Sequence, residues 1–303
     1  MKPERIVHHA SNMGCVVKQD SATVPRIIIF GDSHVHAIQE AIKVRLAGDV
    51  PVSIEARRLL KTKTRDDGSA HPRVPGATLW EWLRERWRGF FRRSNAGSRR
   101  TLGDTTLKEF LAIARSLRPC DILVSAVGGN QHAVFSTIQH ADPFDFFFPE
   151  DRPEETENDV PLIPFRPLYD YFCNGLRLGD GATIAALRRS TRARMVHILA
   201  PPPKRDTAFI HRYHDSHFAS EGISSYGVSS PQLRLKFWRM QNRALREICG
   251  PLGVETIEPP DVACDAEGFL DRSYYARDAT HANAAYGELV LEQLEQCASQ
   301  VVS

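Results

Sequence analysis

The sequence lacks several features that would place the protein in a special class. No apolar run approaches the roughly 18 residues that a helix needs to span a bilayer. The N-terminal stretch 1–14 contains Glu4, His8 and His9 without an apolar core, so it is unlike a secretory signal. Internal repeats and low-complexity tracts are also missing. We therefore expect a globular chain with no membrane span and a cytoplasmic location.

The cysteines lack the spacing of a zinc site or a disulfide framework. No CxxC pair occurs among the six, which stand at Cys15, Cys120, Cys173, Cys249, Cys264 and Cys297. This predicts reduced, mostly buried thiols. Strong charge of one sign is missing too, because 39 Lys and Arg residues nearly balance 37 Asp and Glu residues. A net charge of +2 predicts no nucleic-acid partner.

What is present is enough chain for one large domain. The 303 residues are 42% hydrophobic and 25% charged, close to the globular average. Charge is uneven along the chain, since 57–100 holds 13 basic against 4 acidic residues and 141–160 holds 8 acidic residues against one Arg. We predict an N-terminal extension over 1–24 and one domain over 25–303. That domain has loop insertions near 57–105, 140–178 and 201–230.

Short apolar runs alternate with helical patterns, which predicts an α/β fold with a parallel sheet. The predicted strands are 26–30, 50–54, 121–127, 194–200 and 254–257. The predicted helices are 37–46, 79–90 (basic), 107–114, 184–193, 233–248 and 286–297. Ligands of such sheets bind at the carboxyl ends of the strands, so chemistry is expected directly after each strand.

Three polar blocks stand where such chemistry is expected. They are Gly31-Asp32-Ser33-His34, Gly128-Gly129-Asn130-Gln131-His132 and Asp278-Ala279-Thr280-His281. A serine at a strand's end lies at the mouth of the sheet, and an Asn amide is a good oxyanion donor. An Asp three residues before a His can accept from the imidazole and fix its tautomer. Taken singly, each block is equally explained by a helix cap or a Gly-rich turn.

In combination the blocks resemble the SGNH hydrolase (GDSL esterase/lipase) superfamily, over 25–300. The resemblance implies a three-layer α/β/α sandwich with a five-stranded parallel, flavodoxin-like sheet. It implies Ser33 as nucleophile, His281 as general base and acid, and Asp278 as the residue that orients His281. The oxyanion hole would comprise Ser33 N–H, Gly76 N–H and Asn130. Gly76 is the best match to the family's second block, with Gly68 as competitor.

The resemblance implies hydrolysis of carboxylic esters through an acyl-serine intermediate, with no metal or organic cofactor. A His follows Ser33 where the family usually has an apolar residue, and this variant occurs in domains that act on sugar O-acetyl groups. The substrate is therefore expected to be a small or carbohydrate-linked ester. A glycan O-acetyltransferase with the same triad is an alternative.

Several other residues are candidate substrate contacts or ligands. His34 and His132 are the last residues of the first two blocks, and Lys204 follows the fourth predicted strand, where it could contact an anionic substrate. Each is also explained as a turn residue or a solvated cation. The aromatic and acidic segment 142–148 suggests a lid. His211, His214 and His217 would share a helix face suited to a metal, although an exposed polar loop explains them better.

Two further functions remain open. A metal-dependent phosphoesterase could use Asp32, His34, Asn130, His132 and His281, but no second Gly-Asp block and no late His-x-His motif accompany them. A non-catalytic binding module could use the basic helix within 77–93 as its contact face. The apolar stripe of that helix is equally explained by packing against a core.

Overall fold

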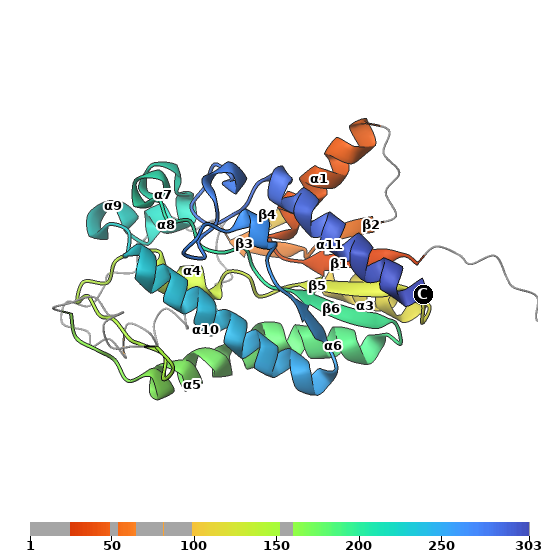
Figure 1. Cartoon of the computed structure of the whole chain (residues 1–303), viewed down its shortest axis with the longest axis horizontal. Helices are drawn as coiled ribbons and strands as arrows, with labels where there is room; N and C mark the ends of the chain where they lie inside the picture. The colour runs from red at the N-terminus through yellow and green to blue at the C-terminus, as the bar shows by residue number, and fades with distance from the viewer. Residues whose placement is uncertain (1–24, 49–53, 65–80, 82–98, 152–159, 303) are drawn as a thin grey trace, which may run out of the picture.

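The computed structural model describes residues 25–48, 54–64, 81, 99–151 and 160–302. Its centre is a sheet of five parallel strands in the order β2-β1-β5-β6-β7 (Figure 1). The strands are β1 (Ile27–Gly31), β2 (Ile54–Arg58), β5 (Ile122–Ala126), β6 (Arg194–Ile198) and β7 (Glu255–Ile257). A separate antiparallel ribbon pairs β3 (Lys61–Thr64) with β4 (Arg99–Leu102).

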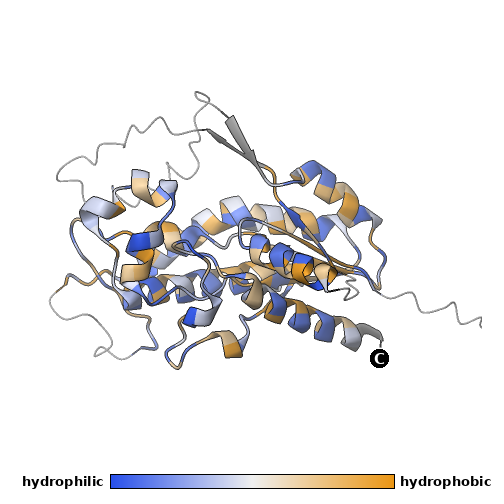
Figure 2. Ribbon diagram, turned by 90° about the horizontal axis from the view of Figure 1, so that it is seen from above, coloured by the Kyte–Doolittle hydropathy of each residue, from blue (hydrophilic) through white to orange (hydrophobic). Residues whose placement is uncertain are grey.

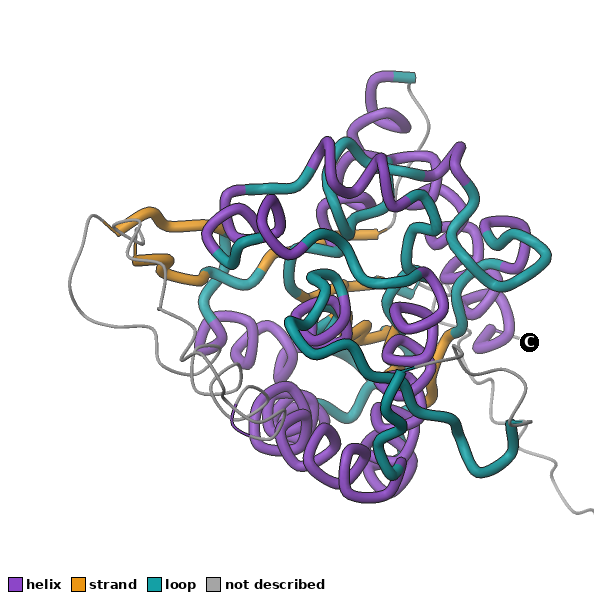
Figure 3. The backbone as a smooth tube through the Cα atoms, turned by 90° about the vertical axis from the view of Figure 1, so that its left-hand side faces the viewer, coloured by secondary structure: helices purple, strands orange, loops and turns teal. Residues whose placement is uncertain are grey.

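Helices cover both faces of the sheet, as the end-on view of Figure 3 shows. One face carries α1 (Val35–Ala47) and α11 (Ala284–Val302). The other carries α3 (Leu107–Ser116), α5 (Phe165–Leu176), a π-helical turn (Arg177–Gly181), α6 (Ala182–Ser190) and α10 (Pro231–Cys249). The predicted α/β/α sandwich is therefore confirmed.

Short helices gather beyond the carboxyl ends of the strands, at the left of Figure 1. They are α4 (Gln131–Ser136), α7 (Thr207–Tyr213), α8 (Ser216–Ser220) and α9 (Ile223–Tyr226). A small apolar cluster joins them to Ala279, beside Asp278. Single 3₁₀ turns follow at Gly250–Leu252, Asp261–Ala263 and Arg272–Tyr274. The insertion predicted at 201–230 is thus largely helical and packs around the end of the sheet.

The alternation of side chains along the buried strands divides the core in two. Ile27 and Ile29 of β1 face α1 and α11, whereas Ile28 and Phe30 face the layer that contains α10. All five residues of β1 are buried, as expected for a central parallel strand. The covering helices carry both hydrophobic and hydrophilic residues, which Figure 2 shows as mixed orange and blue along each ribbon.

Local sequence signals fix the ends of these helices. Thr106 and Glu109 form a capping box at the start of α3. Ser230 accepts from Leu233 N at the start of α10. Gly287 permits the close contact of α11 with α1, because a Cβ there would lie 2.2 Å from the carbonyl oxygen of Ala37.

The second strand is described over Ile54–Arg58, so it continues beyond the predicted 50–54, of which only Ile54 lies within the described residues. An edge strand needs only one buried face and therefore tolerates arginine. One prediction within the described residues was wrong. The segment 142–148 is not a lid. Phe144, Phe146 and Phe148 are buried in the core against Phe237 of α10 and Phe165 of α5.

Other predictions fall on residues that the structure does not describe. The N-terminal extension 1–24 and the basic helix 79–90, except for Glu81, lie outside the described ranges. The five cysteines within these ranges are free thiols. No helix in the described part of the chain has the length and apolar character needed to cross a bilayer.

Candidate active site

The loops that follow β1 and β5 bring Ser33 and Asn130 together. The two strands are neighbours, with Gly31 opposite Ala126 at their carboxyl ends. The Asn130 Nδ2 donates to Ser33 Oγ at 3.0 Å. Residue 34 is the N-cap of α1 and no side chain caps that end, so Ser33 does not serve as a helix cap. The serine hydroxyl thus lies at the sheet edge within reach of a side-chain amide.

Asp32 links the same two loops from beneath. Its Oδ2 accepts from Gly128 N at 3.4 Å, and its own backbone N donates to Ala126 O at 3.2 Å. The sequence suggests Asp32 as a helix cap or, in a phosphoesterase, as a metal ligand. Its position between Gly31 and Ser33 was the sole signal of this cross-strand role.

Asp278 and His281 form a hydrogen-bonded pair directly before α11. His281 Nδ1 lies 2.8 Å from Asp278 Oδ2. Because an ionised carboxylate only accepts, Nδ1 must carry the proton. The other carboxylate oxygen, Oδ1, accepts from the backbone N of Thr280 at 2.9 Å and of His281 at 2.7 Å. His281 Nε2 has no hydrogen-bond partner among the described residues, which leaves it available for a proton.

The ring of His34 connects the serine loop to this pair. It lies 5.1 Å from the His281 ring, measured between centroids. It also packs directly on Gly129, where a Cβ would lie 1.9 Å from His34 Cδ2. The glycine before Asn130 is therefore required by the imidazole after Ser33. The structure brings together Ser33, His34, Asn130, Asp278 and His281.

Burial makes the two other histidines of the site neutral. Burial, followed by positive charge on His281 and His132, lowers the pKa of His34 to about 3. Burial lowers the pKa of His132 to about 4. For Asp278, burial would raise the pKa. The hydrogen bond from His281, its charge and that of Lys204 instead hold this pKa below its usual value.

Two predicted substrate contacts are buried elsewhere. The backbone N of His132 donates to Gln241 Oε1 at 2.8 Å, and its Nδ1 lies 3.3 Å from the same oxygen. Lys204 lies beneath the loop that carries Asp278, with its side chain fully buried. Both side chains are buried, so neither is open to a substrate. Their burial depends on contacts with residues more than 70 positions away in sequence.

The remaining candidate residues lie either outside the described residues or on exposed helices. Gly76, predicted for the oxyanion hole, and its competitor Gly68 lie outside the described residues. His211 and His217 lie on the exposed helices α7 and α8, and His214 lies between them. Within the described ranges, no three His, Cys, Asp or Glu side chains are grouped to hold a metal ion.

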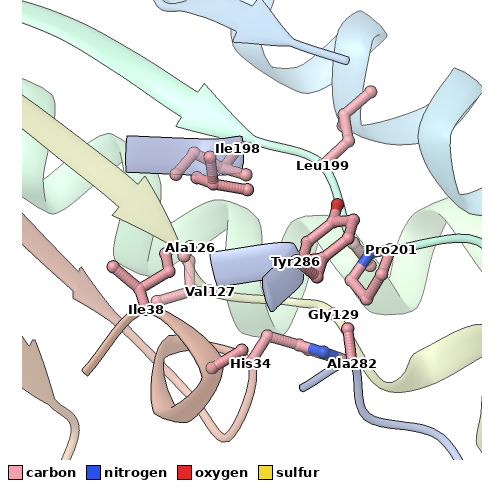
Figure 4. A pocket seen from close by; sticks show the side chains of 13 residues that line it. His34, Ile38, Ala126, Val127, Gly129, Ile198, Leu199, Pro201, Ala282 and Tyr286 are labelled. Atoms are coloured by element: carbon pink, nitrogen blue, oxygen red, sulfur yellow. The ribbon is translucent and has the colours of Figure 1, made fainter. Parts of the chain in front are cut away.

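A small apolar cavity adjoins the site. It has room for about 20 Å³ and lies between the ends of β5 and β6 and helices α1 and α11. His34, Gly129 and Ala282 line it, each the chain neighbour of Ser33, Asn130 or His281 (Figure 4). Other lining residues include Ile38, Ile198 and Tyr286. A space of this size holds one water-sized or methyl-sized group.

Comparisons with known proteins give no sequence relative, since no family model and no curated protein matches the chain. Among solved structures, a GDSL-like lipase from Bacteroides thetaiotaomicron is similar at 10% identity and a TM-score of 0.42, covering 91% of this chain and 88% of its own. A Bacteroides fragilis protein provisionally described as an acylhydrolase is similar at 9% identity and a TM-score of 0.43, over 94% and 90% of the two chains. The periplasmic domain of a Salmonella Paratyphi A lipopolysaccharide acetyltransferase is similar at 12% identity and a TM-score of 0.38, over 90% and 83%.

The fold itself is settled by the sheet. Its parallel strands, its helices on both faces and the position of the polar blocks at the carboxyl edge have the α/β/α architecture that the SGNH resemblance implies.

Proposed function

We propose that the protein is a serine esterase of the SGNH type. The observation that carries this proposal is the pairing of two hydrogen bonds at one edge of the sheet. Asn130 binds the Ser33 hydroxyl at 3.0 Å, and Asp278 binds His281 at 2.8 Å. These two bonds supply a candidate nucleophile with an oxyanion donor and a candidate oriented base, and the His34 ring, next to Ser33 in the chain, lies 5.1 Å from the His281 ring.

The proposed reaction begins when the Ser33 hydroxyl attacks the ester carbonyl. His281 Nε2 takes the hydroxyl proton as the bond from Oγ to carbon forms, and Asp278 stabilises the resulting imidazolium. The imidazolium then gives this proton to the leaving alcohol, and the acyl-serine remains. In the second half of the reaction, water attacks the acyl-serine while His281 takes its proton. The bond from Oγ to carbon then breaks, the proton returns to Ser33, and the carboxylic acid is released. In this structure Ser33 Oγ accepts from Asn130 and His281 Nε2 has no hydrogen-bond partner among the described residues, so attack requires the serine side chain to turn toward Nε2.

When Ser33 turns, the Asn130 amide becomes available for the oxyanion. The Ser33 backbone N–H is the second proposed donor, and Gly76 N–H is the third by resemblance alone. One such donor is worth about 10²–10³ in rate. His34 and His132 stay neutral at neutral pH, so they add no positive charge that would oppose the His281 imidazolium.

The cavity beside His34 supports a short acyl group. Its lining is mostly apolar and its volume of about 20 Å³ matches a methyl group. An acetyl ester would place its methyl there, whereas a long chain would not fit without rearrangement. We therefore propose O-acetyl groups, free or carried by a carbohydrate, as the substrate class.

The test compares nitrophenyl acetate with nitrophenyl decanoate and with an acetylated sugar. The wild type is expected to cleave acetyl esters faster than the decanoate. Ser33→Ala and His281→Ala should each remove nearly all of this activity while leaving the circular dichroism spectrum intact. Full activity in the His281 variant would contradict the proposal. Activity lost in EDTA and restored by a divalent ion would favour the phosphoesterase instead.

A further inference from the structure

Lys204 is a fully buried cation at the base of the loop that carries Asp278 and His281. Its Nζ donates to Ala276 O and to Asp278 O, each at 2.6 Å, and lies 3.5 Å from Asp278 Oδ1. The rings of Phe209 and Tyr275 flank the ammonium, each with its centroid 5.1 Å away. A buried ammonium is costly unless its donors are satisfied, and here two carbonyls and one carboxylate face it.

The two carbonyls belong to the turn that positions the base. Ala276 N donates to His281 O at 3.1 Å, and Asn283 N donates to Tyr274 O at 2.9 Å, so the chain folds back on itself around Asp278. The Lys204 ammonium fills the centre of this turn. From there it binds the backbone of Asp278, whose carboxylate holds the backbone and ring of His281.

Lys204 is itself fixed by an independent part of the fold. Arg234 of α10 donates through Nη2 to Lys204 O at 3.1 Å and to Arg205 O at 2.8 Å. Arg205 N donates to the Tyr275 hydroxyl at 2.9 Å, and Leu270 N donates to Pro203 O at 3.1 Å. The backbone that carries the ammonium is therefore held in place by Arg234 of α10, Leu270 and Tyr275.

We propose that Lys204 is a positioning residue for His281: its ammonium holds the Asp278 turn and keeps the Asp278 carboxylate charged toward the imidazole. This inference rests on the proposed function, since His281 matters only as the base. The charged and titratable groups facing Asp278 are His281 on its own loop, Lys204 after β6 and, through His281, His34 at the start of α1.

A role for the positive charge of Lys204 leads to a prediction that a role in packing alone does not. A cation 3.5 Å from the carboxylate favours ionised Asp278 and disfavours the His281 imidazolium. Without it, the Asp278 pKa and the His281 pKa should both rise. The rising acid limb of kcat/KM should move to higher pH by the same amount, because the base must be neutral to act.

The experiment is an NMR titration of His281 in the full chain, with the signal assigned from a His281→Gln variant. In Lys204→Met, which preserves length and removes charge, the His281 pKa should rise by about one pH unit. In the esterase assay, kcat should fall by about 100-fold with little change in KM. Lys204→Arg, which keeps the charge, should restore the His281 pKa.

Arg205→Met is the matched control. It removes a cation at the next position, whose side chain pairs with Asp265 and Glu267. It should leave the His281 pKa and kcat unchanged. If Lys204→Met does not fold, Lys204→Gln is used in its place, because its uncharged amide can still donate to the backbone carbonyls.

An unchanged His281 pKa in a folded, uncharged Lys204 variant would overturn the inference and leave Lys204 as a structural plug. Failure of the proposed function is distinguishable, because the NMR titration does not depend on catalysis. A wild type without esterase activity that still shows the His281 shift would contradict the function alone.

Discussion

Among the residues whose burial the structure describes, two lysines are buried, and they anchor two different regions. Lys236 of α10 pairs with Asp145 at 2.7 and 2.9 Å, and the pair holds the aromatic segment around Phe146 in the core. Lys204 instead binds two backbone carbonyls and approaches the carboxylate of Asp278 at 3.5 Å. The first region has apolar packing as well as an ion pair, whereas the second is held mostly by polar atoms.

This difference indicates where each cation acts. The Asp145 carboxylate is almost fully buried and makes two hydrogen bonds with its lysine, so the pair is internal to the core. The Asp278 carboxylate is 29% exposed and is shared between Lys204 and a histidine that is 23% exposed. We therefore expect substitutions around Lys236 to reduce stability and substitutions around Asp278 to reduce activity.

The largest effect is expected for Asp278→Asn. The amide can no longer hold His281 in the productive tautomer or support an imidazolium, so kcat should fall by about 10⁴-fold. Stability should change little, since Oδ1 can still accept from the two backbone N–H groups. Steady-state kinetics and urea unfolding of the same preparation measure both quantities. A large loss of stability with activity retained would contradict the view that Asp278 serves activity more than stability.

Asp145→Ala should have the opposite outcome. Removing one member of a buried ion pair takes the carboxylate away from the buried Lys236 and lowers the free energy of unfolding by about 3–5 kcal/mol. Activity per folded molecule should be retained. Urea unfolding tests this, with Asp170→Ala in the exposed Arg166 pair as a control that should not change stability.

A double variant sharpens the same point. Asp145→Leu combined with Lys236→Met replaces both charges by apolar groups and should recover most of the stability that the single change loses. If the double variant is as unstable as Asp145→Ala, the ion pair stabilises the fold in a way that apolar side chains cannot replace.

Asn130→Ala tests the serine side of the site. Loss of the amide that contacts Ser33 should lower kcat by about 10²–10³-fold, because one oxyanion donor is removed. Asn174→Ala, an exposed change on α5, is the control. Equal activity in both variants would show that Asn130 does not face the developing charge.

The smallest effect concerns acid stability. Burial lowers the pKa of His197 to about 4, from a usual value near 6.5. A base with a lowered folded pKa adds stability that is complete above pH 6.5 and is lost as the pH falls toward 4. Between pH 6.5 and 5 this residue alone accounts for about 2 kcal/mol. His197→Gln should flatten that part of the stability curve, whereas exposed His211→Gln should not.

Much of the fold was predictable from local patterns. The apolar runs of β1, β5 and β6 are buried central strands, and such strands need a continuous apolar sequence. The continuation of the edge strand β2 to Arg58 was not predictable, because only part of it is buried and Arg57 and Arg58 interrupt its apolar character. The burial of Phe144 and Phe146 depends on Phe237 and Phe172, which no local pattern connects to them.

The candidate site divides in the same way. Asp278 and His281 are three residues apart, so their hydrogen bond is a local property and was predictable. The contact of Asn130 with Ser33 follows from the adjacency of two strand ends in a parallel sheet. The place of Lys204 was not predictable, since the residues that bury it, Asp278 and Arg234, come from distant elements. Sequence alone suggested a solvent-facing cation at that position.

The most direct test of the central claim is labelling with a fluorophosphonate probe, followed by intact mass and peptide mapping. It asks whether an activated serine exists without requiring the natural substrate. We predict one adduct, on Ser33, in the wild-type protein, and no adduct in His281→Ala. Absence of labelling in the folded wild type, or labelling that persists in His281→Ala, would contradict the assignment of Ser33 and His281 as nucleophile and base.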